Sequence, residues 1–226
     1  MSFIVGIDGP AGTGKGTITK IMAKELGLVN IDTGATYRCV ALYTLKNNIP
    51  LEDKQKIIEN LPNINIDMKN ENGEQTIFLN GEDVTKEIRS KEVSQIVSQV
   101  STIKEVRFAM VEVQRNLAKG KDVIMEGRDI TTYVFPNADV KIYLDADEDE
   151  RARRRYKELI EKGTEISYEE VLKNIQIRDK NDKEKEIGAL KIAEDAVYVD
   201  TTNLTIEEVA QKVKSIIMEK GFKNKA

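Results

Sequence analysis

The feature that most constrains this chain is the glycine-rich run GPAGTGKGT, Gly9–Thr17, which directly follows the apolar run Phe3–Ile7. Strand, glycine-rich turn, lysine and helix in this order are the layout of a phosphate-binding loop. Glycines let the backbone fold around an anion, and the positive dipole end of the next helix lies at the same spot. Lys15 adds a full charge for the β- and γ-phosphates of a nucleoside triphosphate. We expect the triphosphate to be held by Gly9, Pro10, Ala11, Gly12, Thr13, Gly14, Lys15, Gly16 and Thr17.

The loop departs from the strict pattern at one position. Gly16 stands where Ser or Thr normally follows the lysine, and the hydroxyl comes one residue later, at Thr17. An ordinary glycine-rich turn between strand and helix is the alternative. The β-branched run before the loop and the amphipathic helical pattern over about 15–26, stopped by Gly27, favour the phosphate-binding interpretation.

Composition narrows the class of protein. The 226 residues suit one α/β domain, and a net charge of −4 argues against general binding of nucleic acid or membrane surfaces. The single cysteine, Cys39, excludes an internal disulfide framework and fits a reducing compartment. No apolar run is long enough to cross a bilayer and Met1 leads into the first strand without a signal sequence, so we expect a cytoplasmic protein.

The chain has no histidine, which removes every histidine-based triad, general base and metal site. Phosphoryl transfer suits such a chain, because it relies mostly on positioning and on charge neutralisation by Lys, Arg and Mg²⁺.

Short strand-like segments alternate with helical patterns. Residues 3–8, 122–126, 140–144 and 196–200 are apolar and rich in β-branched or aromatic side chains. This alternation predicts a parallel sheet with helices on both faces, whose ligands bind beyond the carboxyl ends of the strands.

One stretch has a different pattern. Residues 64–68 alternate apolar and polar, 76–79 form a second strand-like run, and Asn72-Gly73 and Asn80-Gly81 are hairpin turn signals. We interpret about 60–90 as a small antiparallel insertion, which either decorates the domain or, as we favour, shapes a substrate site. Apolar residues from Val93 to Leu117 predict a long helix or a helix pair.

A later helix carries charges where its packing face should be apolar. Val171 and Ile175 lie on one stripe, and the same stripe continues into Arg178, Asp182 and Lys185. Burying such charges in a dry core is costly, so we expect this half of the helix to line a wet, charged cleft. The alternative is that the helix ends near residue 177 and these are surface charges.

Arginines also gather at two other places. Arg128 follows the strand that ends at Glu126, where a ligand of the sheet should lie. Four arginines follow the strand that ends at Asp145, namely Arg151, Arg153, Arg154 and Arg155. Arginine suits phosphate oxygens, but a solvated helix with ion pairs to Glu148, Asp149, Glu150 and Glu158 is an equally good reading of this cluster.

Taken together, these residues closely resemble the bacterial cytidylate kinase family, within the nucleoside monophosphate kinases. The resemblance runs from Gly6 to about Val213, and the Gly16-Thr17 form of the loop is typical of such kinases. The discriminating runs are DTGATYR at 32–38, LNGEDVT at 79–85 with IRS at 88–90, EGRD at 126–129, RARRR at 151–155 and RDxxD at 178–182.

The resemblance implies an α/β fold: a P-loop NTPase-type parallel sheet flanked by helices, with a small antiparallel β insertion and a short helical lid. One kinase domain, 1–226, would contain a core (about 1–37, 100–147 and 190–226), a monophosphate-binding part (about 38–99) and a lid with its adjoining helix (about 148–189). The implied reaction is Mg²⁺-dependent transfer from ATP to CMP or dCMP, with these nucleotides as the only partners, no nucleic acid or membrane, and a monomer.

The resemblance also implies residue roles. Lys15, Arg128, Arg178 and Arg154 would be catalytic, and Thr17 and, through water, Asp32 would hold the metal. CMP would be bound by Thr33, Arg38, Ser98, Arg107, Arg128, Asp129, Arg178, Asp182 and Lys185, with Ser98, Arg107 and Asp129 at the base and Asp182 at the ribose.

The chain departs from the family pattern at Lys185, where arginine is usual, and at Gly188-Ala189-Leu190, where Ala-Pro-Leu is usual. Lysine keeps the charge but loses the bidentate fork, so we expect a looser pocket. Other small acceptors (UMP, AMP or a shikimate-like molecule) and a non-catalytic ATP-binding regulator remain the alternatives. An RNA-binding protein conflicts with the acidic balance and the few aromatic residues.

Overall fold

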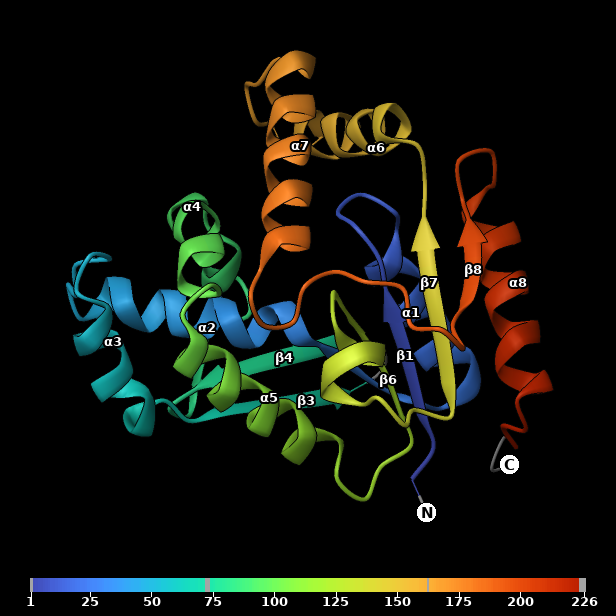
Figure 1. Ribbon diagram of the computed structural model, residues 1–226, viewed down its shortest axis with the longest axis horizontal. Coiled ribbons are helices and arrows are strands. Elements are labelled where there is room, and N and C mark those ends of the chain that lie inside the picture. The colour runs from blue at the N-terminus through green and yellow to red at the C-terminus, as the bar shows by residue number, and fades with distance from the viewer. Residues whose placement is uncertain (1, 72–73, 162, 224–226) are drawn as a thin grey trace. The chain divides into compact units, whose positions relative to one another are not determined.

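A computed structural model of the chain describes residues 2–71, 74–161 and 163–223 (Figure 1). It divides into two compact units, one of Met1–Ser2 and Leu28–Val123 and the other of Phe3–Gly27 and Ile124–Ala226. The division into core, monophosphate-binding part and lid that the sequence suggests is a different one, and it stays a prediction.

The unit of residues 3–27 and 124–226 carries the phosphate-binding loop. Its elements are β1 (Ile4–Asp8), α1 (Lys15–Leu26), most of β6 (Val123–Gly127), a π-helical turn η3 (Ile130–Val134), β7 (Val140–Asp145), α6 (Glu148–Glu161), α7 (Tyr168–Glu184), β8 (Val197–Asp200) and α8 (Ile206–Glu219).

In this unit the strands of the larger, parallel sheet lie in the order β6-β1-β7-β8. Within it, β1 pairs with β7 through Val5 and Val140, and β7 pairs with β8 through Ile142 and Val197 (Figure 1). Successive residues of β1 and β7, such as Val5 and Ile7 or Ile142 and Leu144, are buried, as the near-continuous apolar runs require. On β8, Val199 is buried but Tyr198 is 50% exposed. The predicted parallel sheet flanked by helices is confirmed.

The unit of residues 28–123 holds β2 (Val29–Asp32), α2 (Thr33–Lys46), α3 (Lys54–Asn60), two short 3₁₀ turns (η1, Leu61–Asn63, and η2, Glu87–Arg89), β3 (Ile66–Glu71), β4 (Glu74–Leu79), β5 (Glu82–Asp83), α4 (Lys91–Val100) and α5 (Lys104–Ala118). The pattern from Val93 to Leu117 is therefore a helix pair, interrupted at residues 101–103.

A small antiparallel sheet, β3-β4-β5, lies in this second unit. Ile66 is opposite Leu79 and Met68 is opposite Ile77, and all four side chains are buried. Asn80 and Gly81 both have positive φ, 51° and 86°, as a two-residue type I′ hairpin turn requires. The antiparallel insertion is confirmed; the Asn72-Gly73 turn signal lies outside the described residues.

Helix α7 is continuous to Glu184, so the alternative ending near residue 177 is wrong. Its start is fixed by a capping box, in which Ser167 and Glu170 each bond the other's backbone N–H. Val171 and Ile175 pack with Ala152 of α6 in one apolar cluster. This cluster holds the first half of α7 against α6. The second half of α7 carries the charged residues Arg178, Asp179 and Asp182.

Candidate functional site

The phosphate-binding loop leaves β1 through a passage that only glycine fits. Gly9 has φ 150°, and a Cβ there would lie 2.0 Å from the carbonyl oxygen of Leu144 on β7. Gly12 has φ 82°, and its Cβ would lie 2.9 Å from the carbonyl oxygen of Arg151 on α6. The loop thus passes between the end of β7 and the first turn of α6, and its glycines are required by contact as well as by conformation.

Lys15 begins α1 and is 5% exposed. Its Nζ donates to the carbonyl oxygen of Pro10 at 2.6 Å and to the hydroxyl of Thr13 at 3.3 Å. Burial and the charge of Arg128 hold the pKa of Lys15 well below its ordinary value of 10.5, and Glu126 opposes this shift. Burial and the charge of Arg128 both disfavour the charged form of Lys15, so a polyanion bound at the mouth of the loop would stabilise that charge.

The glycine at position 16 has a physical reason. A Cβ on Gly16 would lie 2.8 Å from Oε1 of Glu126, at the end of β6. The serine or threonine of the strict motif would therefore require the Glu126 carboxylate to move aside. Glu126, the last residue but one of β6, was not among the predicted site residues, although β6 leads directly into Arg128.

Asp182 on α7 joins two of the predicted cations. Its Oδ2 accepts from Nε of Arg128 at 2.6 Å and its Oδ1 from Nζ of Lys185 at 2.7 Å. Burial raises the pKa of Asp182, but the charges of Arg128 and Lys185 outweigh it and hold that pKa below its ordinary value of 3.8. The charged stripe of α7 is partly as expected: Asp182 is buried, but the other buried charge is Asp179, and Arg178 is exposed.

The arginines of α6 divide into one buried and three outer residues. Arg151 is buried, with bonds to Asp179 at 2.6 Å and to the carbonyl oxygen of Ala11 in the loop at 3.1 Å. The outer three form ion pairs within the helix, as the interpretation of a solvated helix predicts: Arg153 with Asp149, Arg154 with Glu150 and Arg155 with Glu158. Arg154 also donates to the carbonyl oxygen of Thr201, after β8, at 2.7 Å.

The remaining predicted residues belong to the unit of residues 28–123. Asp32 caps α2 by accepting from Ala35 N at 3.2 Å, and Thr33 is the first, buried residue of that helix. One turn later Arg38 donates from Nη1 to Ser94 on α4 at 3.2 Å. Asp32 therefore has a structural role as a helix cap in addition to any contact with a metal.

Two residues predicted to read the base lie on α4 and α5. Arg107, on α5, is 3% exposed, with its guanidinium 5.4 Å from the ring centre of Tyr37 and Nη1 3.4 Å from the carbonyl oxygen of Ser101. Ser98, on α4, is half-buried and its carbonyl oxygen accepts from the Ser101 hydroxyl at 2.8 Å. Both residues thus lie close to the link of residues 101–103 that joins the two helices.

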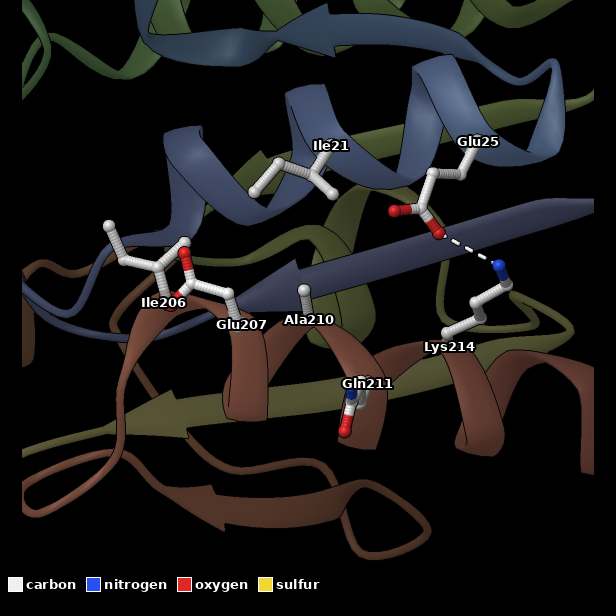
Figure 2. A pocket seen from close by; sticks show the side chains of 7 residues that line it. All are labelled: Ile21, Glu25, Ile206, Glu207, Ala210, Gln211 and Lys214. Atoms are coloured by element: carbon white, nitrogen blue, oxygen red, sulfur yellow. Dashed lines mark hydrogen bonds and ion pairs between the residues drawn. The ribbon is translucent and has the colours of Figure 1, made fainter.

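Figure 2 shows a groove between α1 and α8, lined by Ile21, Glu25, Ile206, Glu207, Ala210, Gln211 and Lys214. An ion pair of 2.8 Å between Lys214 and Glu25 crosses it. None of the residues predicted to bind nucleotides lines this groove.

In the part of the chain that the structure describes, no three acidic or cysteine side chains gather as metal ligands. A magnesium ion that travels with a nucleotide needs no such cage, because phosphates and waters supply most of its ligands. None of the described helices is long and apolar enough to cross a membrane.

A buried lysine in a glycine-rich loop, at the carboxyl end of a parallel strand and close to the charge of Arg128, defines a nucleotide-binding kinase of the P-loop class. The sequence model described as Cytidylate kinase matches residues 5–219. This chain belongs to the cytidylate kinase family, and it is therefore an enzyme of the phosphotransferase class. The family, the fold class and the enzyme class expected from the sequence are confirmed.

Relatives support this membership over nearly the whole chain. A cytidylate kinase of Caldicellulosiruptor bescii is 53% identical over 209 residues, 92% of each chain. A cytidylate kinase of Fusobacterium nucleatum subsp. nucleatum is 50% identical over 208 residues, 92% of this chain and 94% of its own. A crystal structure of an uncharacterized protein from Eubacterium ventriosum aligns with a TM-score of 0.52 at 9% identity, over 96% of this chain and 99% of its own, a likeness of fold alone.

Proposed function

We propose that this enzyme transfers the γ-phosphoryl group of ATP, with Mg²⁺, to CMP or dCMP. The observation that carries the proposal is the buried Lys15, held in the glycine-rich loop by Pro10 and under the charge of Arg128. The names of the relatives support cytidylate as the acceptor.

The absence of histidine agrees with this chemistry. The acceptor is a phosphate that is already ionised near neutral pH, so no general base is needed. Catalysis then depends on bringing two anions together in line, which requires fixed cations and backbone dipoles.

On the donor side, the loop from Gly9 to Thr17 binds the triphosphate, and Lys15 neutralises charge on the transferred group. Mg²⁺, when bound, would offset the negative charge of the phosphate groups. Oxygen donors of the chain would suit this ion: the hydroxyl of Thr17, which is exposed on the first turn of α1, and, through water, the carboxylate of Asp32. Arg154 and its neighbours on α6 belong to a lid that excludes water.

On the acceptor side, Arg38, Arg128 and Arg178 hold the phosphate of CMP, and Thr33 and Lys185 also bind this nucleotide. Asp182 already accepts from Arg128 and Lys185, and a carboxylate has further lone pairs for the ribose hydroxyls. Ser98, Arg107 and Asp129 read the amino and carbonyl groups of the base. We also propose that the enzyme acts as a monomer, in the cytoplasm, without nucleic-acid partners.

The test is a coupled ADP-release assay with ATP, Mg²⁺ and CMP, dCMP, UMP, AMP or shikimate as acceptor. We expect strong turnover with CMP and dCMP alone, and its loss in Lys15→Met, while Lys20→Met, an exposed lysine of the same helix, retains it. Turnover with a different acceptor would reject the assignment of Ser98, Arg107 and Asp129 to the base, but it would still support a kinase. ATP binding without any turnover would reject the proposal.

A further inference from the structure

Asp8 is a buried carboxylate that the proposed reaction does not use. It ends β1, directly before the loop, and it is fully buried. Its Oδ1 accepts from Ile130 N at 2.8 Å, and its Oδ2 accepts from Thr131 N at 2.7 Å and from the Thr131 hydroxyl at 2.6 Å. All three donors belong to one short segment, 122 and 123 residues away in the sequence.

That segment is the start of the π-helical turn η3, which directly follows Arg128 and Asp129. The residue before a helix commonly caps its first N–H groups with its own side chain. Asp129 stands at this position and makes no such cap bond. Asp8 supplies the cap from β1 instead, so the side chain of Asp129 is not committed to capping. Turns of this type are rare and are frequent at functional sites.

The contact between β1 and η3 has little slack. A Cβ on Gly6 would lie 2.8 Å from Cγ2 of Thr131 and 3.0 Å from Cγ2 of Ile130. On the other side of Asp8, the backbone of Gly9 is also tightly packed, because a Cβ there would lie 2.0 Å from the carbonyl oxygen of Leu144. Since the backbone is fixed on both sides of Asp8, a shift of η3 would break its bonds to the carboxylate rather than be absorbed by the strand.

We propose that Asp8 is a positioning residue for phosphoryl transfer: its ionised carboxylate holds the segment that carries Arg128 and Asp129 at a fixed place relative to the phosphate-binding loop. The inference rests on the proposed function for the roles of Arg128 and Asp129. Small misplacements of groups that align reacting phosphates are costly in rate, so a capped and immobile η3 favours turnover more than it favours binding.

The protonation state of Asp8 matters for this role. Burial raises its pKa to about 6, the charge of Asp129 adds to this, and the bonds from Thr131 and Ile130 oppose it. The charged or titratable groups that face it are Lys15 from α1, Asp129 before η3, and Tyr143 from β7. A protonated carboxyl would bring an O–H to a place where backbone N–H donors already point, which weakens the cap.

The experiment compares the pH dependence of kcat, at saturating ATP-Mg²⁺ and CMP, in the wild type, Asp8→Asn, Thr131→Val and Thr131→Ser. Thr131→Val keeps the shape and removes one bond to the carboxylate, so the acid limb should move up by roughly one pH unit. Thr131→Ser should overlay the wild type. The phosphate of CMP itself titrates near pH 6, but this is common to all variants. Asp8→Asn should lower kcat about 100-fold at pH 8, with a smaller rise in the KM for CMP because Asp129 moves with the same segment, and an unchanged KM for ATP.

An acid limb of Thr131→Val that coincides with that of Thr131→Ser would overturn the inference, as would an effect of Asp8→Asn on KM alone. If Asp8→Asn does not fold, the comparison of the acid limbs of Thr131→Val and Thr131→Ser tests the inference by itself. Failure of the wild type to phosphorylate CMP would reject the proposed function instead. An NMR titration of the Asp8 carboxyl carbon in both Thr131 variants, without nucleotide, then tests whether protonation of Asp8 causes the acid limb. Equal pKa values of Asp8 in the two variants would overturn the inference.

Discussion

Arg128 and Asp182 form an ion pair of 2.6 Å between the end of β6 and the last turns of α7, and both side chains are largely buried. The other oxygen of Asp182 holds Lys185 at 2.7 Å. One carboxylate therefore orients two cations that we propose contact the acceptor. Without it, two positive side chains would face each other in a site shielded from water.

Asp182→Asn tests this arrangement. The substitution leaves Arg128 and Lys185 without their shared counter-charge, and removal of one partner of a buried pair is typically worth about 3 kcal/mol of stability. We expect a loss of this size in the free energy of unfolding by urea, with a lower kcat/KM for CMP. Glu158→Gln, which breaks the exposed pair with Arg155, is the matched control and should leave both values unchanged. Equal effects of the two substitutions would contradict the finding.

Lys185→Arg tests the departure from the family pattern. Lys185 is a compact charge on Asp182, whereas arginine offers a planar fork that can bond both Asp182 and a phosphate. We expect the KM for CMP to fall a few-fold with kcat little changed. Lys183→Arg, at an exposed position of α7, serves as control. An unchanged or raised KM in Lys185→Arg would show that this side chain does not touch the substrate.

The parts of the fold that local patterns encode were predictable from the sequence. The loop, the parallel strands and the antiparallel hairpin follow from glycine spacing, apolar runs and the Asn80-Gly81 turn. Strand β2 was missed, because Val29–Asp32 is only four residues long and includes the polar but buried Asn30.

The site was predictable in its residue types but not in its pairings. Counting along the stripe of α7 pointed inward to Arg178, yet the helix buries Asp179. Asp179 is then the partner of Arg151, and Asp8 is the cap of η3. Both links join residues far apart in the sequence, so no local rule could find them.

Asp179→Asn should disturb the ATP side of the enzyme. Arg151 would keep its bond to Ala11 in the loop but lose its buried counter-charge. We expect about 3 kcal/mol of lost stability and a raised KM for ATP, with a smaller change in the KM for CMP. Initial-rate kinetics with each nucleotide varied in turn measure this. Asp149→Asn, which breaks the exposed pair with Arg153, should change neither KM. A selective rise in the KM for CMP would refute the assignment of Arg151 to the loop.

The raised pKa of Asp8 makes stability depend on pH. The carboxyl titrates near 3.8 in the unfolded chain and near 6 in the folded protein, mainly because of burial. Between these values the folded protein holds a proton that the unfolded chain has lost, so this contribution to stability falls as pH rises from about 4 to about 6. The difference in unfolding free energy between wild type and Asp8→Asn should therefore be about 1 to 2 kcal/mol smaller at pH 7.5 than at pH 4.5. A difference that is constant or grows with pH would contradict the shift.

Cys39 offers a test of the unit of residues 28–123 that needs no substitution, because it is the chain's only cysteine. It lies in the middle of α2 with no exposed surface, and burial, with a smaller effect of Asp32, raises the pKa of its thiol to about 12 from 9.0. Since the thiolate is the reactive form, a shift of this size alone lowers its population about a thousandfold at pH 8. We expect reaction with a disulfide reagent to be slower in the folded protein by at least this factor than in urea. Comparable rates in the two states would mean that α2 opens readily, and the buried contacts of Thr33 and Arg107 with their neighbours would then not hold in solution.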